Sequence, residues 1–505
     1  MDSGIPGIEL MRRAAEFALD TLTQRWPSAK RLLIWTGAGN NAGDGYLLAK
    51  LALARGLAAR VVAVSDPDGL RGDAAVAYAQ AAAAGVEIST EAGEIVPQRD
   101  CVWVDALLGI GLSRELDPRF RGAVDSINAG TAPVLSLDIP SGLCADTGAV
   151  LGAAVIADVT TTFVAMKRGL LTAHGCDLTG EILFCDLGIP AALSAGLEPA
   201  AVTRVDCFSP ACALPPRANN SHKGSHGHVV VVGGDHGYGG ACVLAAEAAL
   251  YSGAGLVSVV TRSAHRAGIL ARRPELMVVG SEDAPSGKQD GGDHPGWREA
   301  VSALLMRASA IVLGPGLGRG EWGRQLCLMV MAAAKARSTP LLIDADALFF
   351  LSDEPTGKGG KTLFPPGAAG DGLRPWVITP HPGEAALLLD LPIAEVQRDR
   401  FASVQALARR YRSQALLKGA GSVMCADGER LLLCTEGNPG MATGGMGDVL
   451  SGLIGGLLAQ GLDPATSLEV GVCLHGEAGD LAAQRVGQRG LMASELLPEI
   501  RRLLN

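Results

Sequence analysis

Hydrophobic and polar positions follow two patterns along the chain: short apolar runs, and longer segments with apolar residues at helical spacing. Residues 8–26 carry apolar positions every three or four residues, which predicts an amphipathic helix. The elements expected after it are strands at 31–35, 61–64, 101–104 and 134–137, with helices at 46–55 and 72–84. Because strands alternate with helices, the first part of the chain is expected to form an α/β domain with a parallel sheet.

The alternation stops at 206–221 and then resumes. Paired Pro215 and Pro216 mark a linker, so we place a domain boundary after residue 213. Beyond it we expect a helix at 240–252 and strands at 229–232, 256–261, 310–313, 341–344, 377–379 and 415–417. Gly- and Pro-rich stretches at 281–296 and 352–375 are expected to be surface excursions. The chain is therefore predicted to hold two α/β domains, 1–213 and 214–505.

Composition supports this picture and excludes several classes of protein. A chain of 505 residues is too long for one core, and 48% hydrophobic with 19% charged residues indicates a globular protein. The net charge of −9 argues against non-specific nucleic-acid binding. The 11 cysteines form no C-x-x-C pair, and the first residues have no signal-peptide pattern, which indicates reduced thiols in a cytoplasmic protein. No apolar stretch reaches membrane-spanning length.

The most informative stretch, 438–452, is a glycine-rich turn that leads into an apolar helix. Its glycines disfavour a helix up to Gly447, and an apolar run begins at Asp448. Such a turn offers unpaired backbone N–H groups and the positive end of a helix dipole to a phosphate or a developing oxyanion. Asp448 could then act as a base. Taken alone, the stretch is equally consistent with a structural turn capped by an aspartate.

A second glycine-rich loop, 36–45, joins a predicted strand to a helix in the first half. This arrangement is typical of phosphate-binding turns, although the paired asparagines differ from the usual dinucleotide fingerprint. Asp44, Asp105 and Asp138 follow or end predicted parallel strands and are therefore expected to be neighbours. Three carboxylates repel one another unless a cation lies among them or one stays protonated. Oxygen ligands favour an alkali or alkaline-earth cation over zinc.

Polar signatures also follow the predicted strands of the second half, at 314–318, 344–346, 380–384 and 418–422. Together with 438–452, this ordered series favours a nucleotide site at one edge of a sheet. His222, His226 and His228 follow the linker. Because no partner cluster accompanies them, we interpret them as a polar loop lining a site mouth, with a metal site as the less favoured alternative.

The motifs of the first half together resemble the NAD(P)H-hydrate epimerase family. They are GIPGIELM (4–11), GNNAGDG (39–45), DALLGIG (105–111) and DIPSG (138–142), continued at 163–169 and 186–190. The resemblance implies a Rossmann-like three-layer sandwich that binds a damaged dinucleotide and a potassium ion. Ala38 and Ala42 stand where the family usually has Lys and Gly.

The resemblance also implies the residues of this first site. The substrate contacts would be Asn40, Asn41, Ala42, Gly43, Asp44, Gly109, Ile110, Gly111, Leu112, Ser113, Arg114, Glu115 and Asp138. The potassium ligands would be Asn41, Asp105 and Ser141. Asp138 is the candidate catalytic base, with Asp44 as the alternative.

The strand-end series of the second half resembles the ribokinase-like fold and, within it, the ADP-dependent NAD(P)H-hydrate dehydratase family. Its motifs are GPGLG (314–318), TPHPGE (379–384) and NPGMATGGMGDVLSG (438–452). The resemblance implies a three-layer α/β/α domain in which Asp448 is catalytic and magnesium accompanies ADP. The ADP contacts would be Lys418, Gly419, Ala420, Gly421, Ser422 and Gly447, and the substrate contacts Ala254, Gly318 (or Gly316), His381 and Asp448.

Both resemblances point to one repair pathway for hydrated nicotinamide nucleotides. The first domain would equilibrate the R and S hydrates of NADH and NADPH. The second would dehydrate the S epimer at the expense of ADP, giving AMP and phosphate. We expect a cytoplasmic homo-oligomer that acts on small molecules, with neither nucleic acid nor membrane as partner. Two alternatives stay open: a small-molecule kinase that uses ATP, and a first domain that only binds nucleotide or supports oligomerisation.

Overall fold

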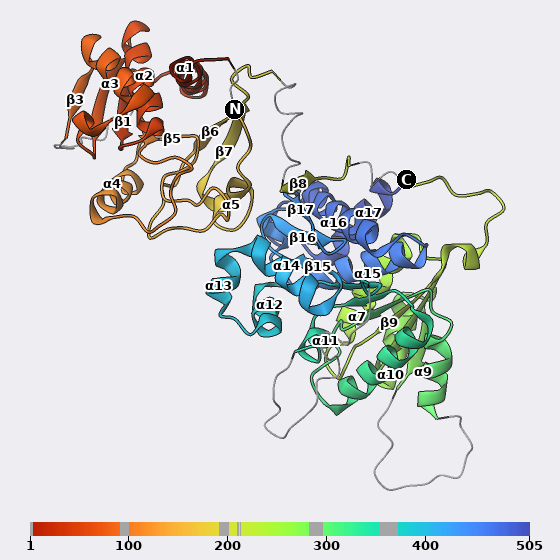
Figure 1. The fold of residues 1–505 in the computed structure, drawn as a ribbon. Helices are drawn as coiled ribbons and strands as arrows, with labels where there is room; N and C mark the ends of the chain where they lie inside the picture. The colour runs from red at the N-terminus through yellow and green to blue at the C-terminus, as the bar shows by residue number, and fades with distance from the viewer. Residues whose placement is uncertain are drawn as a thin grey trace. The chain divides into compact units, whose positions relative to one another are not determined.

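The computed structural model describes residues 4–90, 100–190, 201–209, 212, 214–281, 296–352 and 372–505. The chain forms two compact units that divide between Ala200 and Ala201, and each unit is described by itself (Figure 1). The expected surface excursions at 281–296 and 352–375 lie largely outside the described residues. No described helix is both long and apolar enough to cross a membrane.

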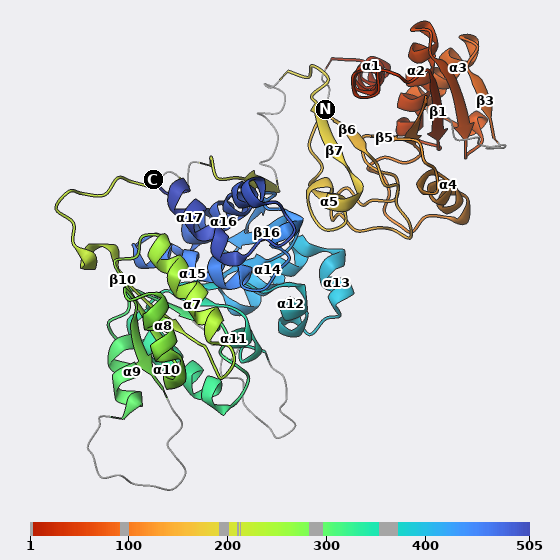
Figure 2. The same cartoon turned by 180° about the vertical axis from the view of Figure 1, so that it is seen from behind.

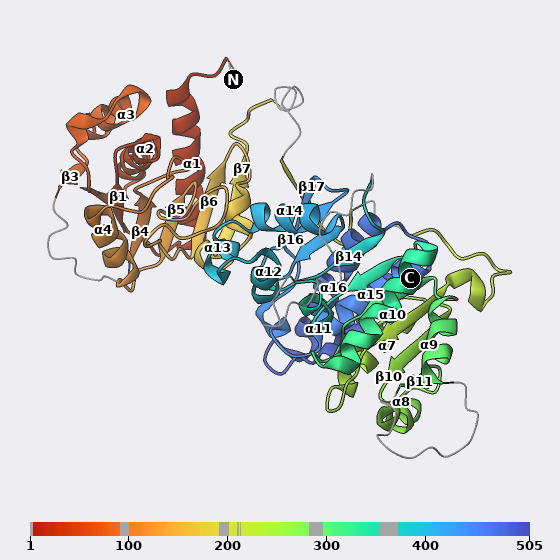
Figure 3. The same ribbon diagram turned by 60° about the horizontal axis from the view of Figure 1, so that its bottom comes forward.

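The first unit is built on a seven-stranded parallel sheet in the order β3-β2-β1-β4-β5-β6-β7. Its elements are α1 (Gly7–Arg25), β1 (Arg31–Thr36), α2 (Asn40–Ala54), β2 (Ala58–Ala63), α3 (Gly72–Ala83), β3 (Glu87–Ser89), β4 (Cys101–Ala106), α4 (Pro118–Asn128), β5 (Val134–Leu137), β6 (Val159–Phe163), α5 (Gly175–Leu178) and β7 (Glu181–Cys185). The predicted Rossmann-like layering is confirmed. Figure 3 shows α1, α2 and α3 on one face of this sheet and α4 on the other.

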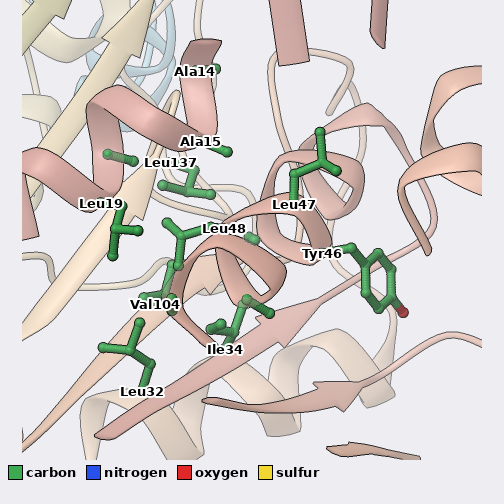
Figure 4. Close-up of a cluster of buried hydrophobic side chains, with 14 of the residues drawn as sticks. Ala14, Ala15, Leu19, Leu32, Ile34, Tyr46, Leu47, Leu48, Val104 and Leu137 are labelled. Atoms are coloured by element: carbon green, nitrogen blue, oxygen red, sulfur yellow. The ribbon is translucent and has the colours of Figure 1, made fainter. Parts of the chain in front are cut away.

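Helices cover both faces of the first sheet, so the side chains on both faces of its strands are apolar. Leu32 and Ile34 of β1 pack with α1 and α2 in the cluster of Figure 4. Leu33 and Trp35 alternate with them and pack beside α4. Complete burial of a side chain of this size contributes about 1.5–3 kcal/mol, so this layer fixes α2 against the sheet.

The glycine loop after β1 is shorter than predicted, because α2 begins at Asn40 and not at residue 46. Gly39 is extended and forms the helix N-cap position. At Gly37 a Cβ would lie 2.1 Å from the carbonyl oxygen of Leu107, so only glycine allows this approach. Asn40 and Asn41 therefore lie in the first helical turn, next to the segment that follows β4.

The second unit is built on a ten-stranded sheet in the order β11-β10-β9-β12-β13-β14-β15-β16-β17-β8. Its elements are β8 (Val202–Val205), β9 (His228–Val232), α7 (Gly239–Tyr251), β10 (Leu256–Thr261), α8 (Arg266–Arg272), β11 (Met277–Gly280), α9 (Trp297–Leu305), β12 (Ala310–Leu313), α10 (Glu321–Arg337), β13 (Leu341–Ile343), α11 (Asp346–Phe349), β14 (Trp376–Ile378), α12 (Pro382–Leu389), α13 (Ile393–Arg398), α14 (Arg400–Tyr411), β15 (Gln414–Leu417), β16 (Ser422–Ala426), β17 (Arg430–Cys434), α15 (Met446–Ala459), α16 (Pro464–Val486) and α17 (Leu496–Leu503). β16 is antiparallel to both of its neighbours, and the other pairs are parallel.

β8 extends the second unit toward the N-terminus. Val202–Val205 pairs in parallel with β17, so the compact units divide before the predicted linker. The extent of the two functional domains, 1–213 and 214–505, stays a prediction.

The helix that carries Asp448 is fixed by glycines that allow close backbone contact. A Cβ at Gly452 of α15 would lie 1.9 Å from the carbonyl oxygen of Ala245 in α7, and one at Gly455 would lie 2.2 Å from Val312 of β12. Figure 2 shows α7 and α15 side by side. The start of α15 is therefore held firmly against the sheet.

Candidate active sites

The glycine turn of the second unit runs into the first turn of α15. Gly445 has φ +93° and takes the N-cap position, so α15 begins at Met446 and Asp448 is its third residue. The helix starts before Asp448, earlier than predicted. The N-cap position requires a left-handed backbone, which glycine accepts. The backbone N–H groups of this first turn have no partner within the helix, as an anion site requires.

Buried charged side chains meet at the carboxyl edge of the sheet beside this turn. Lys418, after β15, donates a hydrogen bond to Asp344, after β13, with an Nζ–Oδ1 distance of 2.7 Å. Its Nζ also lies 3.8 Å from Glu384 in α12. Ser451 of α15 donates to the other oxygen of Asp344 at 2.6 Å. These contacts tie α15 to the ends of three other elements.

Burial raises the pKa of Asp448 to about 7, with the Asp344 charge adding to the effect and Lys418 opposing it. Burial also disfavours the charged form of Asp344, yet the charge and hydrogen bond of Lys418 bring its pKa below the ordinary value. For Lys418, burial is outweighed by the acidic neighbours, and its pKa is raised. Asp344 and Lys418 thus form an ion pair, whereas Asp448 has the pKa of a general base near neutral pH.

The turn 418–422 rests on a buried guanidinium that the sequence analysis missed. Arg400, at the start of α14, is 1% exposed. Its Nη2 donates to the carbonyl oxygens of Leu417, Lys418 and Gly421 at 3.1, 3.2 and 3.4 Å. Arg400 therefore sets the path of the backbone that the resemblance assigns to ADP.

His381 and Gly318 lie at the same edge of the sheet. His381 caps α12: its Nδ1 accepts from the N–H groups of Gly383 and Glu384 at 3.0 and 3.2 Å. Gly318 has φ +70°, and its N–H donates to Asp346 at 3.0 Å. Both predicted substrate contacts thus lie in loops that follow parallel strands.

Ala254 lies at the opposite edge. It precedes β10 and packs in the core with Val205 and Val257, because a short loop connects α7 to the amino end of this strand. The structure therefore does not bring Ala254 together with Asp448. Ala241, near the start of α7, lies beside the GPGLG loop instead: a Cβ at Gly316 would lie 3.2 Å from its Cβ.

A cavity of about 430 Å³ lies along the glycine turn. Its walls are Pro439, Gly440, Ala442 and Thr443 on one side and residues 488–491 on the other. The segment 488–491 carries no motif, so no signal in the sequence could have selected it.

The three histidines after the linker are engaged separately. His222 Nδ1 accepts from the N–H of Gly224, His226 Nε2 lies 3.0 Å from Ser221 Oγ, and His228 Nε2 lies 2.8 Å from Ser258 Oγ. Within the described part of the chain they join no group of potential metal ligands. The metal alternative therefore has no support.

In the first unit, Asp138 follows β5 with a left-handed backbone, φ +67°. Its Oδ1 accepts from Lys167 Nζ, which also donates to the carbonyl oxygen of Phe163 at 2.8 Å. Lys167 was not among the predicted site residues, although it lies in the matching segment 163–169. Burial raises the pKa of Asp44 well above its ordinary value, and the nearby Asp138 charge adds to the effect. Burial therefore favours the protonated form of Asp44, whereas Asp138 is ion-paired with Lys167.

Asp105 lies at the centre of a cluster of oxygen atoms in this unit. It is fully buried and accepts hydrogen bonds from the Oγ of Ser141 at 2.6 Å and the Oγ of Ser136 at 2.9 Å. Burial raises its pKa, against the effect of these hydrogen bonds. Asn41 donates to the carbonyl oxygen of Leu108 at 3.0 Å, while its own Oδ1 is buried without a hydrogen-bond partner among the described residues. A buried amide oxygen without a donor is a suitable cation ligand.

The remaining predicted contacts of this unit fall into two groups. The loop 109–115 is mostly exposed, and a Cβ at Gly109 would lie 3.5 Å from Asn41 Cβ, so the loop begins at the site. Ala42 is completely buried, and a Cβ at Gly43 would lie 2.5 Å from Met11 in α1. These two residues therefore face the core and offer only backbone to a ligand.

Both sites have the features of enzymes that act on nucleotides: loops at the carboxyl edge of an α/β sheet, an anion-binding helix start and buried acid–base groups. Residues 229–502 match a family model described as NAD(P)H-hydrate dehydratase, and residues 7–169 match one described as YjeF-related protein N-terminus.

Relatives cover the whole chain. The bifunctional NAD(P)H-hydrate repair enzyme Nnr of Coxiella burnetii is 40% identical over 511 residues, covering 100% of this chain and 96% of the relative. The enzyme of the same name from Escherichia coli is 41% identical over 506 residues, covering 99% of this chain and 90% of the relative. A ribokinase-like superfamily protein from Enterococcus faecalis has a TM-score of 0.51 and 29% identity, over 61% of this chain and 97% of that one.

The chain belongs to the family of bifunctional NAD(P)H-hydrate repair enzymes. It is an enzyme with an epimerase half and a dehydratase half. The predicted ribokinase-like fold of the second half is confirmed.

Proposed function

We propose that the chain epimerises the R and S hydrates of NADH and NADPH in its first unit and dehydrates the S epimer in its second, using ADP and releasing AMP and phosphate. The observation that supports the proposal most directly is Asp448, a buried carboxyl in the first turn of α15 whose pKa is raised to about 7. Such a base at an anion-binding helix start suits the activation of a hydroxyl toward a phosphoryl group.

In the second unit, Asp448 takes the proton of the ring hydroxyl as its oxygen attacks the terminal phosphoryl group of ADP. AMP leaves, and the N–H groups at the start of α15 stabilise the charge on the phosphoryl oxygens. The phosphate group then leaves and the neighbouring ring carbon loses its proton to water, which restores the ring double bond. The turn 418–422 and Gly447 hold ADP, while Gly318 and His381 hold the substrate. Given its position, we replace Ala254 in this proposal with Ala241.

Magnesium would be held by the phosphates of ADP. We assign it no protein ligand, because Asp344 is engaged by Lys418 and Ser451. In the first unit, the buried Oδ1 of Asn41, with Asp105 and Ser141, fits a potassium ion. Such an ion would supply positive charge beside an anionic dinucleotide.

The contacts in the first unit also favour one assignment of base and acid between Asp138 and Asp44. Asp138 is the proposed base, since it is paired with Lys167, and the protonated Asp44 is the proposed acid. Proton exchange between two such groups suits inversion at the hydrated carbon. The homo-oligomer and the cytoplasmic location stay predictions.

Incubation of the full chain with ADP and chemically prepared S hydrate tests the proposal for the second unit. We expect dihydronicotinamide absorbance to return together with an equal amount of AMP. A stable phosphorylated hydrate would identify a kinase instead. Incubation of R hydrate without ADP tests the first unit, where appearance of the S epimer is expected and its absence would leave only a nucleotide-binding role.

A further inference from the structure

Thiols and carboxylates form a cluster in the second unit that the repair reaction does not use. The Sγ atoms of Cys434 and Cys473 and a carboxylate oxygen of Glu436 all lie within 4.8 Å of one another. A second group, Cys207, Glu436 and Glu477, meets the same limit and shares Glu436. The cluster joins three segments: the stretch after β8, the end of β17 and the middle of α16.

The thiols and carboxylates of this cluster are in close contact. Cys434 is 1% exposed and Cys473 is completely buried. Glu436 accepts from the backbone N–H of Cys207 at 3.0 Å and from the thiol of Cys434 at 3.9 Å. The thiol of Cys212 is hydrogen-bonded to that of Cys473.

No cation of the described chain balances these acids. Neither Glu436 nor Glu477 forms an ion pair with a Lys or Arg in the described ranges, whereas Arg430 of the same strand pairs with Glu469 at 3.1 Å. Partly buried carboxylates beside thiols are costly in their charged form unless a cation lies among them, and otherwise they keep their proton. The donor set, two or more thiols and one carboxylate, is the set that zinc prefers.

We propose that Cys434, Glu436 and Cys473 bind a structural zinc ion, with Cys212 as the fourth ligand. Tetrahedral zinc with bonds of about 2.0–2.3 Å needs ligand atoms about 3.3–3.8 Å apart, so small side-chain rotations complete the site. Each coordinating thiol releases its proton on binding. A disulfide between Cys434 and Cys473 would be the other use of two close thiols, but it would leave Glu436 and Glu477 without a cation.

The ion would hold the upstream end of the phosphate-binding turn. Gly437 and Asn438 follow Glu436 directly, and both bind Asp480 of α16 at 2.8 Å. Zinc at Glu436 would extend this attachment to β17 and to the segment after β8. Its effect is therefore expected on stability and not on the chemical step.

The test is the metal content of the full chain purified without chelator from zinc-supplemented cells. We expect about one zinc ion per chain, and at least about a tenfold loss in the double variant Cys434→Ser, Cys473→Ser. Cys327→Ser, which changes a buried thiol of α10, is the matched control and should keep its zinc. Cobalt(II) added to metal-free protein should give thiolate charge-transfer absorption in the wild type and not in the double variant.

A second measurement covers the case in which the double variant does not fold. Zinc added to chelator-treated wild-type protein should raise its unfolding temperature and release protons. Wild-type protein that neither retains zinc nor responds to added zinc or cobalt would overturn the proposal. A mass two hydrogens lower, in protein free of metal, would assign a disulfide and overturn it as well.

Discussion

Asp448, the proposed general base of the second unit, has an environment that lowers stability. It lies in the first turn of α15, and burial raises its pKa to about 7. The ion pair of Lys418 with Asp344 lies beside it, so part of the positive charge that could stabilise its carboxylate is already used. We therefore make separate predictions for how substitution of Asp448 changes the rate of dehydration and the stability of the second unit.

Replacing Asp448 with Asn should lower dehydration of the S hydrate by about 10²–10⁴-fold, because the base is lost while the backbone of the turn is kept. Binding of ADP, measured by calorimetry, should change little. In the wild type, kcat should rise with pH and level off above about 7, as the base loses its proton. Retained turnover in Asp448→Asn would refute the assignment.

The same substitution should stabilise the second unit above acidic pH. A carboxyl whose pKa is raised by folding keeps its proton in the native state while the unfolded chain ionises, so wild-type stability falls between the ordinary value of 3.8 and about 7. The advantage of Asp448→Asn should grow over this window, no faster than about 1.4 kcal/mol per pH unit, and stay constant above it. Urea titrations at pH 4, 6 and 8 would measure it, and an advantage that did not change with pH would contradict the prediction.

A substitution of Lys167 tests the role of Asp138 in the first unit. Substitution to Met removes the cation that holds Asp138 and should lower kcat of epimerisation more than it changes KM. Lys50→Met, which removes a contact with Gln80 between α2 and α3, serves as control. An unchanged epimerisation rate in Lys167→Met would mean that Asp138 needs no partner.

At the scale of elements, most helices and strands follow from the apolar pattern, and the site residues follow from the strand ends. The predicted starts of α2 and α15 were wrong. Both helices begin earlier, because each start depends on a single glycine at the N-cap position, Gly39 or Gly445. β8 was missed because only its pairing with β17 makes it a strand. The contact of Lys418 with Asp344 joins the ends of β15 and β13, which lie on either side of β14, and local sequence carries no signal for it.

The turn between β15 and β16 gives the element-scale prediction. Arg400→Met would leave the carbonyl oxygens of this turn without their buried donor, which costs about 1–3 kcal/mol per unsatisfied group. We expect KM for ADP to rise more than kcat falls, because the turn is proposed to bind ADP and not to take part in the chemical step. Arg409→Met, on the exposed face of the same helix, should leave both constants unchanged. A loss of kcat with unchanged KM would place the effect of Arg400 elsewhere.

At the scale of the whole molecule, each unit has its own sheet, core and site. Each site contains its own acid–base groups, so neither unit needs the other for its chemical step. The two reactions are therefore expected to communicate through free substrate: the S hydrate made by one chain can be used by another.

A mixture of two variants, each of which lacks one of the two activities, tests this expectation. Asp138→Asn should dehydrate S hydrate at the wild-type rate and fail to use R hydrate beyond its spontaneous epimerisation. Asp448→Asn should epimerise R hydrate and form no NADH. With ADP present, the mixture should convert R hydrate completely, because the intermediate diffuses between chains. If the mixture formed NADH no faster than the separate variants together, the two sites would have to exchange substrate within one chain.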